Sequence, residues 1–114
     1  MITIKGVDPS MIANNLEPIQ PVHPGDMIKD EIECRGISQK KLAEQSGIPY
    51  TALNEVLNGK RPVSTEYALL LEAALGVEAG IWIKTQADYD LITAKRNQSL
   101  AKRLAKIREI AAML

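Results

Sequence analysis

The chain has 114 residues, of which 46% are hydrophobic and only 4% aromatic, with no phenylalanine. This length has room for one small domain with an extension, and a core of Leu, Ile, Ala and Val suits packed helices better than a sheet sandwich. The formal net charge is zero, but residues 91–114 contain six basic residues and one acid, so this segment carries +5 and the remainder −5. We therefore expect an all-α protein with an asymmetric charge distribution.

Several classes of protein are excluded at this stage. Cys34 is the single cysteine, so an internal disulfide is excluded and a structural thiol in a reducing compartment is expected. No run of residues approaches the ~18 consecutive apolar residues of a membrane span. The first ten residues lack the basic start and apolar stretch of a signal peptide. These features favour a cytoplasmic protein.

The N-terminal segment is rich in proline, which removes an amide donor and disfavours helix in the preceding residue. We interpret 17–24 as an extended segment, preceded by a helical turn at Ser10–Asn15 with Ser10 as its cap. The four prolines of this segment are Pro9, Pro18, Pro21 and Pro24.

Helix start and stop signals follow in close succession after this segment. Serine and proline are frequent at helix starts, and glycine is frequent just after helix ends. The signals predict five helices. They run from Pro24 to Gly36, from Ser38 to Gly47, from Pro49 (in the first turn) to Asn58-Gly59, from Ser64 (as cap) to Gly76, and from about Ala79 to about Leu91.

A sixth amphipathic segment lies beyond Asn97. Apolar residues recur there at a 4-3-4-3 spacing, which marks one face of a helix; they are Leu100, Leu104, Ile107, Ala111 and Leu114. Three interpretations stay open: a helix folded back on its own domain, a short dimerising coiled coil, or a basic arm that contacts nucleic acid or a toxin.

Residues 38–61 carry the most informative spacing, and we call them the reading head. A small residue, Ala43, lies where two helices must pass closely, and Gly47 four residues later suits a sharp turn with positive φ. Ile48, Leu53 and Val56 then fill the angle between the two helices. This pattern is typical of a helix-turn-helix, whose second helix enters the major groove of DNA.

The side chains left outside this core suit DNA contact. The outward face of the third helix is polar and consists of Tyr50, Thr51, Asn54, Glu55 and Asn58. Amide and methyl groups can read base edges in the major groove. Gln39 and Lys40, at the amino end of the second helix, are expected near phosphate, and Lys60 and Arg61 extend a positive rim. The first helix carries acids (Asp26, Asp30, Glu31, Glu33) and is expected to face away from DNA.

The stretch GISQKKLAEQSGIPYTALNEVLNGKR resembles the Xre/Cro-type helix-turn-helix of phage repressors and bacterial regulators. HPGDMI (23–28), ALGVEAGIW (74–82) and the set Gln86, Tyr89, Asp90 and Leu91 add a narrower resemblance to HigA-like (VapI-like) antitoxins. The resemblance runs from about Pro24 to Leu91 and implies a five-helix, lambda-repressor-like domain. Here the chain continues into an additional C-terminal helix.

The resemblance also implies a function. A dimer would bind its own operator as double-stranded DNA, neutralise a small RelE-like (HigB-like) ribonuclease toxin and repress its operon. By match to the motif, Gln39, Tyr50, Thr51, Asn54 and Glu55 take base- or backbone-reading positions, and Asn58 and Lys60 clamp the backbone; Ser38, Lys40 and Arg61 complete the expected DNA-binding set. The recognition helix departs from the commonest pattern because it begins with proline and carries the bulky Tyr50, so its operator does not follow from relatives.

The expected organisation is an N-terminal extension (1–22), the helix-turn-helix domain (23–91) and a basic amphipathic C-terminal helix (92–114). His23, the single histidine, is expected at a helix entry, because one His and one Cys cannot form a metal site. Trp82 and Tyr89 are seven residues apart on one helix face, which favours a core or dimer-interface role. No catalytic, metal or cofactor set is evident, so we expect no enzyme and no cofactor. A stand-alone regulator without a toxin, or a scaffold for protein contacts only, remains the alternative.

Overall fold

A computed structural model describes residues 20–114 of the chain. Within this range it contains six helices and no strand, which confirms the all-α prediction. The expected helical turn at Ser10–Asn15 and residues 17–19 of the extended segment lie outside the described residues. The helices are α2 (Pro24–Arg35), α3 (Gln39–Ser46), α4 (Tyr50–Leu57), α5 (Thr65–Leu75), α6 (Ala79–Lys95) and α7 (Gln98–Ala112).

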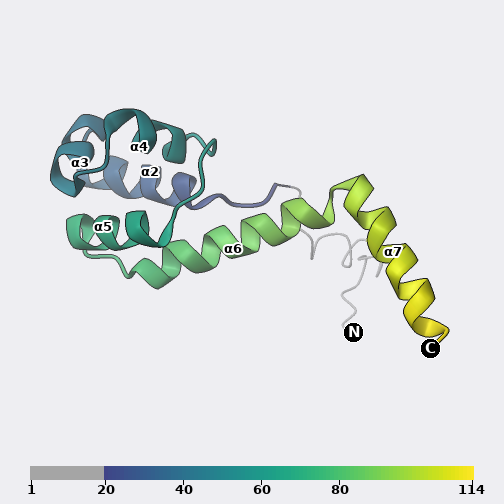
Figure 1. Cartoon of the computed structure of the whole chain (residues 1–114). Helices are drawn as coiled ribbons and strands as arrows, with labels where there is room; N and C mark the ends of the chain where they lie inside the picture. The colour runs from purple at the N-terminus through teal and green to yellow at the C-terminus, as the bar shows by residue number, and fades with distance from the viewer. Residues whose placement is uncertain (1–19) are drawn as a thin grey trace, which may run out of the picture.

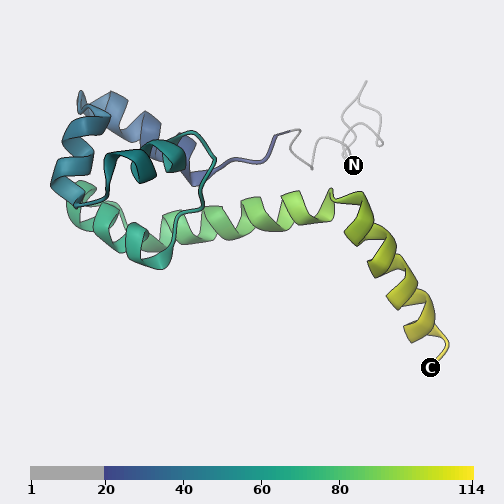
Figure 2. The ribbon, with the colours of Figure 1, turned by 45° about the horizontal axis from the view of Figure 1, so that its top comes forward.

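Two parts can be distinguished in the arrangement of these helices (Figure 1). Helices α2 to α5 and the start of α6 pack together as a helical body, residues 23–86. The rest of α6 extends out of this body, and α7 turns off at an angle; we call residues 87–112 the C-terminal arm. In Figures 1 and 2 alike α7 lies well away from the body. The interpretation that α7 folds back on its own domain is therefore wrong.

The helix ends follow the predicted signals. The side chains of Ser38 and Ser64 accept hydrogen bonds from Lys41 N and Tyr67 N, each at 3.1 Å. All four glycines of the predicted stops lie in the left-handed region, with φ of 68°, 77°, 73° and 75° at Gly36, Gly47, Gly59 and Gly76. Such a conformation disfavours any residue with a Cβ.

Two helix boundaries differ from the prediction. Pro49 is the residue before α4 rather than part of its first turn, because its ψ of 139° is extended. Residues 92–95 belong to α6 rather than to the C-terminal helix. The break falls at Arg96-Asn97, where the Asn97 side chain accepts a hydrogen bond from Leu100 N at 2.9 Å and caps α7.

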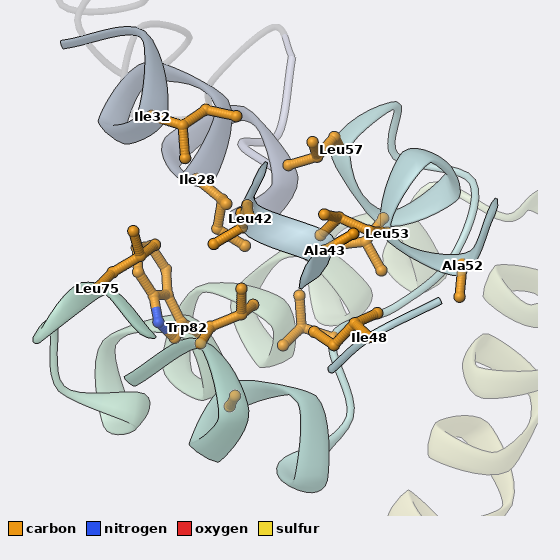
Figure 3. Packing of buried hydrophobic residues seen from close by; sticks show 14 of the residues in the cluster. Ile28, Ile32, Leu42, Ala43, Ile48, Ala52, Leu53, Leu57, Leu75 and Trp82 are labelled. Carbon is orange, nitrogen blue, oxygen red and sulfur yellow. The ribbon is translucent and has the colours of Figure 1, made fainter. Parts of the chain in front are cut away.

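The hydrophobic core draws side chains from every helix of the body. Ile28 of α2, Leu42 of α3 and Leu53 of α4 are fully buried, and Trp82 of α6 is 1% exposed. Figure 3 shows these side chains converging between the helices. Trp82 is the largest of them, and full burial of a large side chain stabilises a fold by about 1.5–3 kcal/mol. Trp82 therefore fixes the start of α6 to the body, which confirms the predicted core role.

His23 anchors the start of α2, as predicted for a helix entry. Its Nδ1 accepts a hydrogen bond from Gly25 N at 2.9 Å, and its ring meets that of Tyr89 edge-on at 4.9 Å. Burial lowers the pKa of His23, although the charges of Asp26 and Asp90 oppose this shift. The neutral imidazole required for the cap is thus the favoured form.

Gly25 lies where α2 approaches the end of α4. A Cβ built on Gly25 would lie 2.0 Å from the carbonyl oxygen of Val56. Only glycine permits this close approach, so the sequence His-Pro-Gly sets how α2 packs against α4.

Gln86 joins α6 to the segment that follows α4. Its Oε1 accepts a hydrogen bond from Val63 N and its Nε2 donates to Asp90 Oδ1, both at 2.9 Å. Gln86 is buried, so these bonds satisfy polar groups that would otherwise be costly to bury. Among the helices of residues 20–114, none is long and apolar enough to cross a membrane.

Candidate nucleic-acid interface

The turn between α3 and α4 is held by its own backbone and by Ser46. Gly47 has φ 77° and donates its N–H to Ala43 O at 2.9 Å. The Ser46 hydroxyl donates to Leu42 O at 2.7 Å and accepts from Ile48 N at 3.3 Å. Ile48 is then buried beneath the turn. The predicted helix-turn-helix geometry is thereby formed, with the angle between the helices fixed from inside.

Helix α4 has one buried face and one accessible face, as the sequence predicts. Its buried residues are Ala52, Leu53, Val56 and Leu57. Tyr50, Thr51 and Asn58 are exposed, whereas Asn54 and Glu55 are half-buried. The five predicted DNA-contacting residues of α4 therefore share one accessible face, and neighbouring side chains partly cover Asn54 and Glu55 in its middle.

A row of amide side chains crosses this face. Asn54 Nδ2 donates to Gln39 Oε1 at 2.9 Å and so joins α4 to the first turn of α3. Asn58 Nδ2 donates to Asn54 O at 2.9 Å and to Asn54 Oδ1 at 3.2 Å. Lys29 Nζ of α2 donates to Asn58 Oδ1 at 3.4 Å. The row fixes the orientation of Gln39: its oxygen accepts from Asn54, and its NH₂ group points away as a donor.

The positive rim differs from expectation at Arg61. Arg61 Nε and Nη2 donate to Glu55 Oε1 at 2.9 and 2.6 Å, so the arginine's charge is offset by a carboxylate. This hydrogen bond and the charge of Glu55 raise the pKa of the guanidinium. Ser38, Lys40, Lys41 and Lys60 are exposed around the same face. Within residues 20–114 the lysines therefore supply the positive charge of the rim more directly than Arg61 does.

Two neighbouring features were missed from the sequence. The Gln39–Asn54 and Glu55–Arg61 pairs join residues 15 and 6 positions apart, and no local spacing rule predicts such contacts.

No group of three or more His, Cys, Asp or Glu suited to a metal ion occurs in the described part of the chain. Cys34 is exposed on α2.

Comparison with known proteins identifies close similarities. Residues 28–82 match the helix-turn-helix family model HTH_3. Virulence-associated protein A of Dichelobacter nodosus is 40% identical over 73 residues, which cover 62% of this chain and 72% of that protein. Antitoxin HigA-1 of Vibrio cholerae is 36% identical over 85 residues, which cover 73% of this chain and 80% of that protein.

A solved structure also matches. The Pseudomonas aeruginosa antitoxin HigA, determined with the higBA promoter, superposes with a TM-score of 0.67 at 27% identity. The match covers 75% of this chain and 91% of that protein.

Proposed function

Because the chain belongs to the HigA-like antitoxins of the Xre-type helix-turn-helix family, we propose that it neutralises a RelE-like ribonuclease toxin in the cytoplasm and, as a dimer, represses its own operon. The observation that carries this proposal is the ordered polar face of α4, where Gln39 and Asn54 are joined by a hydrogen bond. The related Pseudomonas antitoxin, solved with its promoter, has the same overall fold.

In the proposed complex, two copies of α4 enter successive major grooves about 34 Å apart on a pseudo-palindromic operator. Tyr50, Thr51 and Asn54 face the base edges, because they lie on the accessible side of α4. An asparagine amide can pair with adenine, and a threonine methyl can contact a thymine methyl. These three residues set the sequence preference.

The phosphate contacts come from the border of the same face. Ser38 and Gln39 start α3, where free backbone N–H groups and the helix dipole favour an anion. Lys40 and Lys60 are exposed and add charge on either side. These contacts fix register without reading sequence.

The remaining predicted site residues take supporting roles in this proposal. Glu55 accepts two hydrogen bonds from Arg61 and so positions the guanidinium group. On DNA binding, Arg61 either contacts a phosphate while still bonded to Glu55 or leaves Glu55 for the phosphate. Asn58 extends the amide row toward Lys29 and borders the backbone-contacting surface.

The toxin is expected to be basic, as an RNA-cleaving enzyme must hold an anionic substrate. The acidic residues of α2, among them the exposed Asp30 and Glu33, offer a complementary surface. A basic helix such as α7 does not. We therefore assign toxin contact to α2 rather than to the C-terminal arm.

The test uses the full chain with the DNA upstream of its own gene, and measures anisotropy of labelled duplexes. We expect binding to the upstream duplex to exceed that to a shuffled duplex by at least 10³-fold at physiological salt. Co-expression with the product of the adjacent gene should restore growth, and the two proteins should co-purify. Operator binding without restored growth would indicate a stand-alone regulator. Absence of any DNA binding at low salt would indicate that the helix-turn-helix serves protein contacts only.

A further inference from the structure

The amide row that crosses the accessible face of α4 consists of Asn58, Asn54 and Gln39. We propose that this row has a fixed direction, and that Lys29 and Asn58 are positioning residues which make Gln39 present its NH₂ group to a phosphate of the operator. The inference deepens the proposed function and rests on it for the presence of DNA. The direction of the row itself belongs to the free chain.

The row begins at Lys29 of α2, a half-buried side chain. Its Nζ donates to Asn58 Oδ1 at 3.4 Å. An ammonium group has three donors and no acceptor, so only the oxygen of the Asn58 amide can face it. We expected the acidic residues of α2 to turn this helix away from DNA, but Lys29 brings one cation of α2 to the border of the DNA-facing side chains.

A backbone carbonyl fixes the same orientation of Asn58 a second time. Asn58 Nδ2 donates to Asn54 O at 2.9 Å, and a carbonyl oxygen can only accept. The amide of Asn58 is therefore held between a group that only donates and a group that only accepts. Exchanging its oxygen and its NH₂ group would break both contacts.

Each amide of the row then orients the next one. Asn58 Nδ2 also donates to Asn54 Oδ1 at 3.2 Å, so the NH₂ group of Asn54 points the other way. There it donates to Gln39 Oε1 at 2.9 Å. Gln39 ends the row with its oxygen turned inward and its NH₂ group turned outward as a donor. All the donors therefore point in one direction, from α2 toward the first turn of α3.

An outward donor at this position suits a phosphate oxygen. Phosphate oxygens only accept hydrogen bonds, and the free backbone N–H groups at the start of α3 favour the same anion. If the row were reversed, the oxygen of Gln39 would face the phosphate and repel it. Asn54 keeps one hydrogen and one lone pair beyond those used in the row, so its proposed pairing with adenine is compatible with this arrangement.

Asn58→Asp tests the direction of the row in the full chain without DNA. A carboxylate still accepts from Lys29 but cannot donate to Asn54, so the amide of Asn54 must turn, and Gln39 must turn with it and become the donor. The exchange of the Gln39 side-chain NH₂ hydrogens with water is measured by NMR. We expect one of these hydrogens to exchange about fivefold more slowly in the variant, as for one hydrogen bond gained.

Gln45→Glu is the matched control for this test. It makes the same change from amide to carboxylate at an exposed position of α3 outside the row, and should leave the Gln39 exchange unchanged. Asn54→Asp provides a second route to reversal, because a carboxylate there cannot donate to Gln39, and it serves if Asn58→Asp does not fold. Unchanged Gln39 exchange in the folded reversal variants, or an equal change in the control, would overturn the proposal.

The second test identifies the phosphate with operator duplexes that carry one methylphosphonate linkage at each position in turn. Such a linkage has no charge and one acceptor oxygen fewer. The linkage that faces Gln39 is the one whose substitution weakens binding by the natural chain, by about tenfold, but not by Gln39→Leu. In Asn58→Asp the same substitution should leave affinity unchanged or raise it, because an oxygen then faces this linkage. An equal loss in the natural chain and in Asn58→Asp would refute the proposal.

The two tests separate this inference from the proposed function. If the natural chain does not bind its upstream DNA, the proposed function fails, and the NMR measurement still decides whether the row has the stated direction. If the natural chain binds the operator but Gln39 exchange is the same in every variant, the direction of the row is wrong and the proposed function stands.

Discussion

The contact between Gly25 and α4 gives the sharpest prediction about the fold. In Gly25→Ala the new methyl group would lie 2.0 Å from Val56 O and 2.9 Å from Val56 C. Since ordinary contact begins near 3.4 Å, α2 and α4 must separate by more than about 1 Å. Both colliding groups belong to helix backbones, so no side-chain rotation relieves the contact.

The expected cost is at the upper end of that for overpacking, about 3 kcal/mol in the free energy of unfolding. The displacement also moves the carboxyl end of α4, the proposed recognition helix, so we expect operator affinity to fall even where the variant is folded. Urea unfolding at fixed protein concentration measures the first effect, and anisotropy with the operator duplex measures the second.

Gly80 provides the matched control for this prediction. It also lies in a helix, but a Cβ there meets nothing within 4 Å. Gly80→Ala should stabilise the chain by about 0.5–1 kcal/mol, because alanine loses less conformational entropy on folding. A Gly25→Ala variant within 0.5 kcal/mol of the natural chain would refute the argument from close approach.

Further predictions concern the cap, the reading face and the buried amide. Burial lowers the pKa of His23 below 6.5, so the unfolded chain binds the additional proton more readily than the folded chain does. The contribution of His23 to the free energy of unfolding should therefore be complete above pH 6.5 and decrease as the pH drops below it. His23→Asn should flatten this pH dependence in thermal unfolding. Asn54→Ala should cost about 1–3 kcal/mol of operator binding and relax specificity at one position, and equal weakening on all duplexes would contradict base reading. Lys60→Ala should lower the slope of log affinity against log salt by about one, and an unchanged slope would exclude a phosphate contact. Gln86→Met leaves the Val63 N–H unpaired and should cost about 1–3 kcal/mol in urea unfolding; a smaller loss would mean that water replaces the bond.

Local signals made much of the fold predictable from sequence. Serine caps, glycine stops and apolar spacing act within a few residues, so the starts of α3 and α5 and the ends of α2 and α3 were placed correctly. The buried set Ile48, Leu53 and Val56 followed from the same spacing.

Features that depend on distant residues were not predictable in this way. Gln39 and Asn54 were assigned separately to phosphate and base, and only the packing of α3 against α4 brings them within 2.9 Å. Likewise Arg61 was expected to add to the positive rim, but the chain turns after α4 and brings it to Glu55. The direction of α7 was also open, since an amphipathic pattern identifies an apolar face without its partner.

The unbroken course of α6 has a consequence for the position of α7. Its 17 residues run for about 25 Å from Ala79, at the helical body, to the joint with α7. This length, together with the rotation of about 100° per residue, sets both the distance and the angle of α7 relative to the helical body. One residue added after Gln86 would shift α7 by about 1.5 Å and turn its apolar face by about 100° relative to the helical body. The length of α6 therefore fixes where α7 lies relative to the helix-turn-helix.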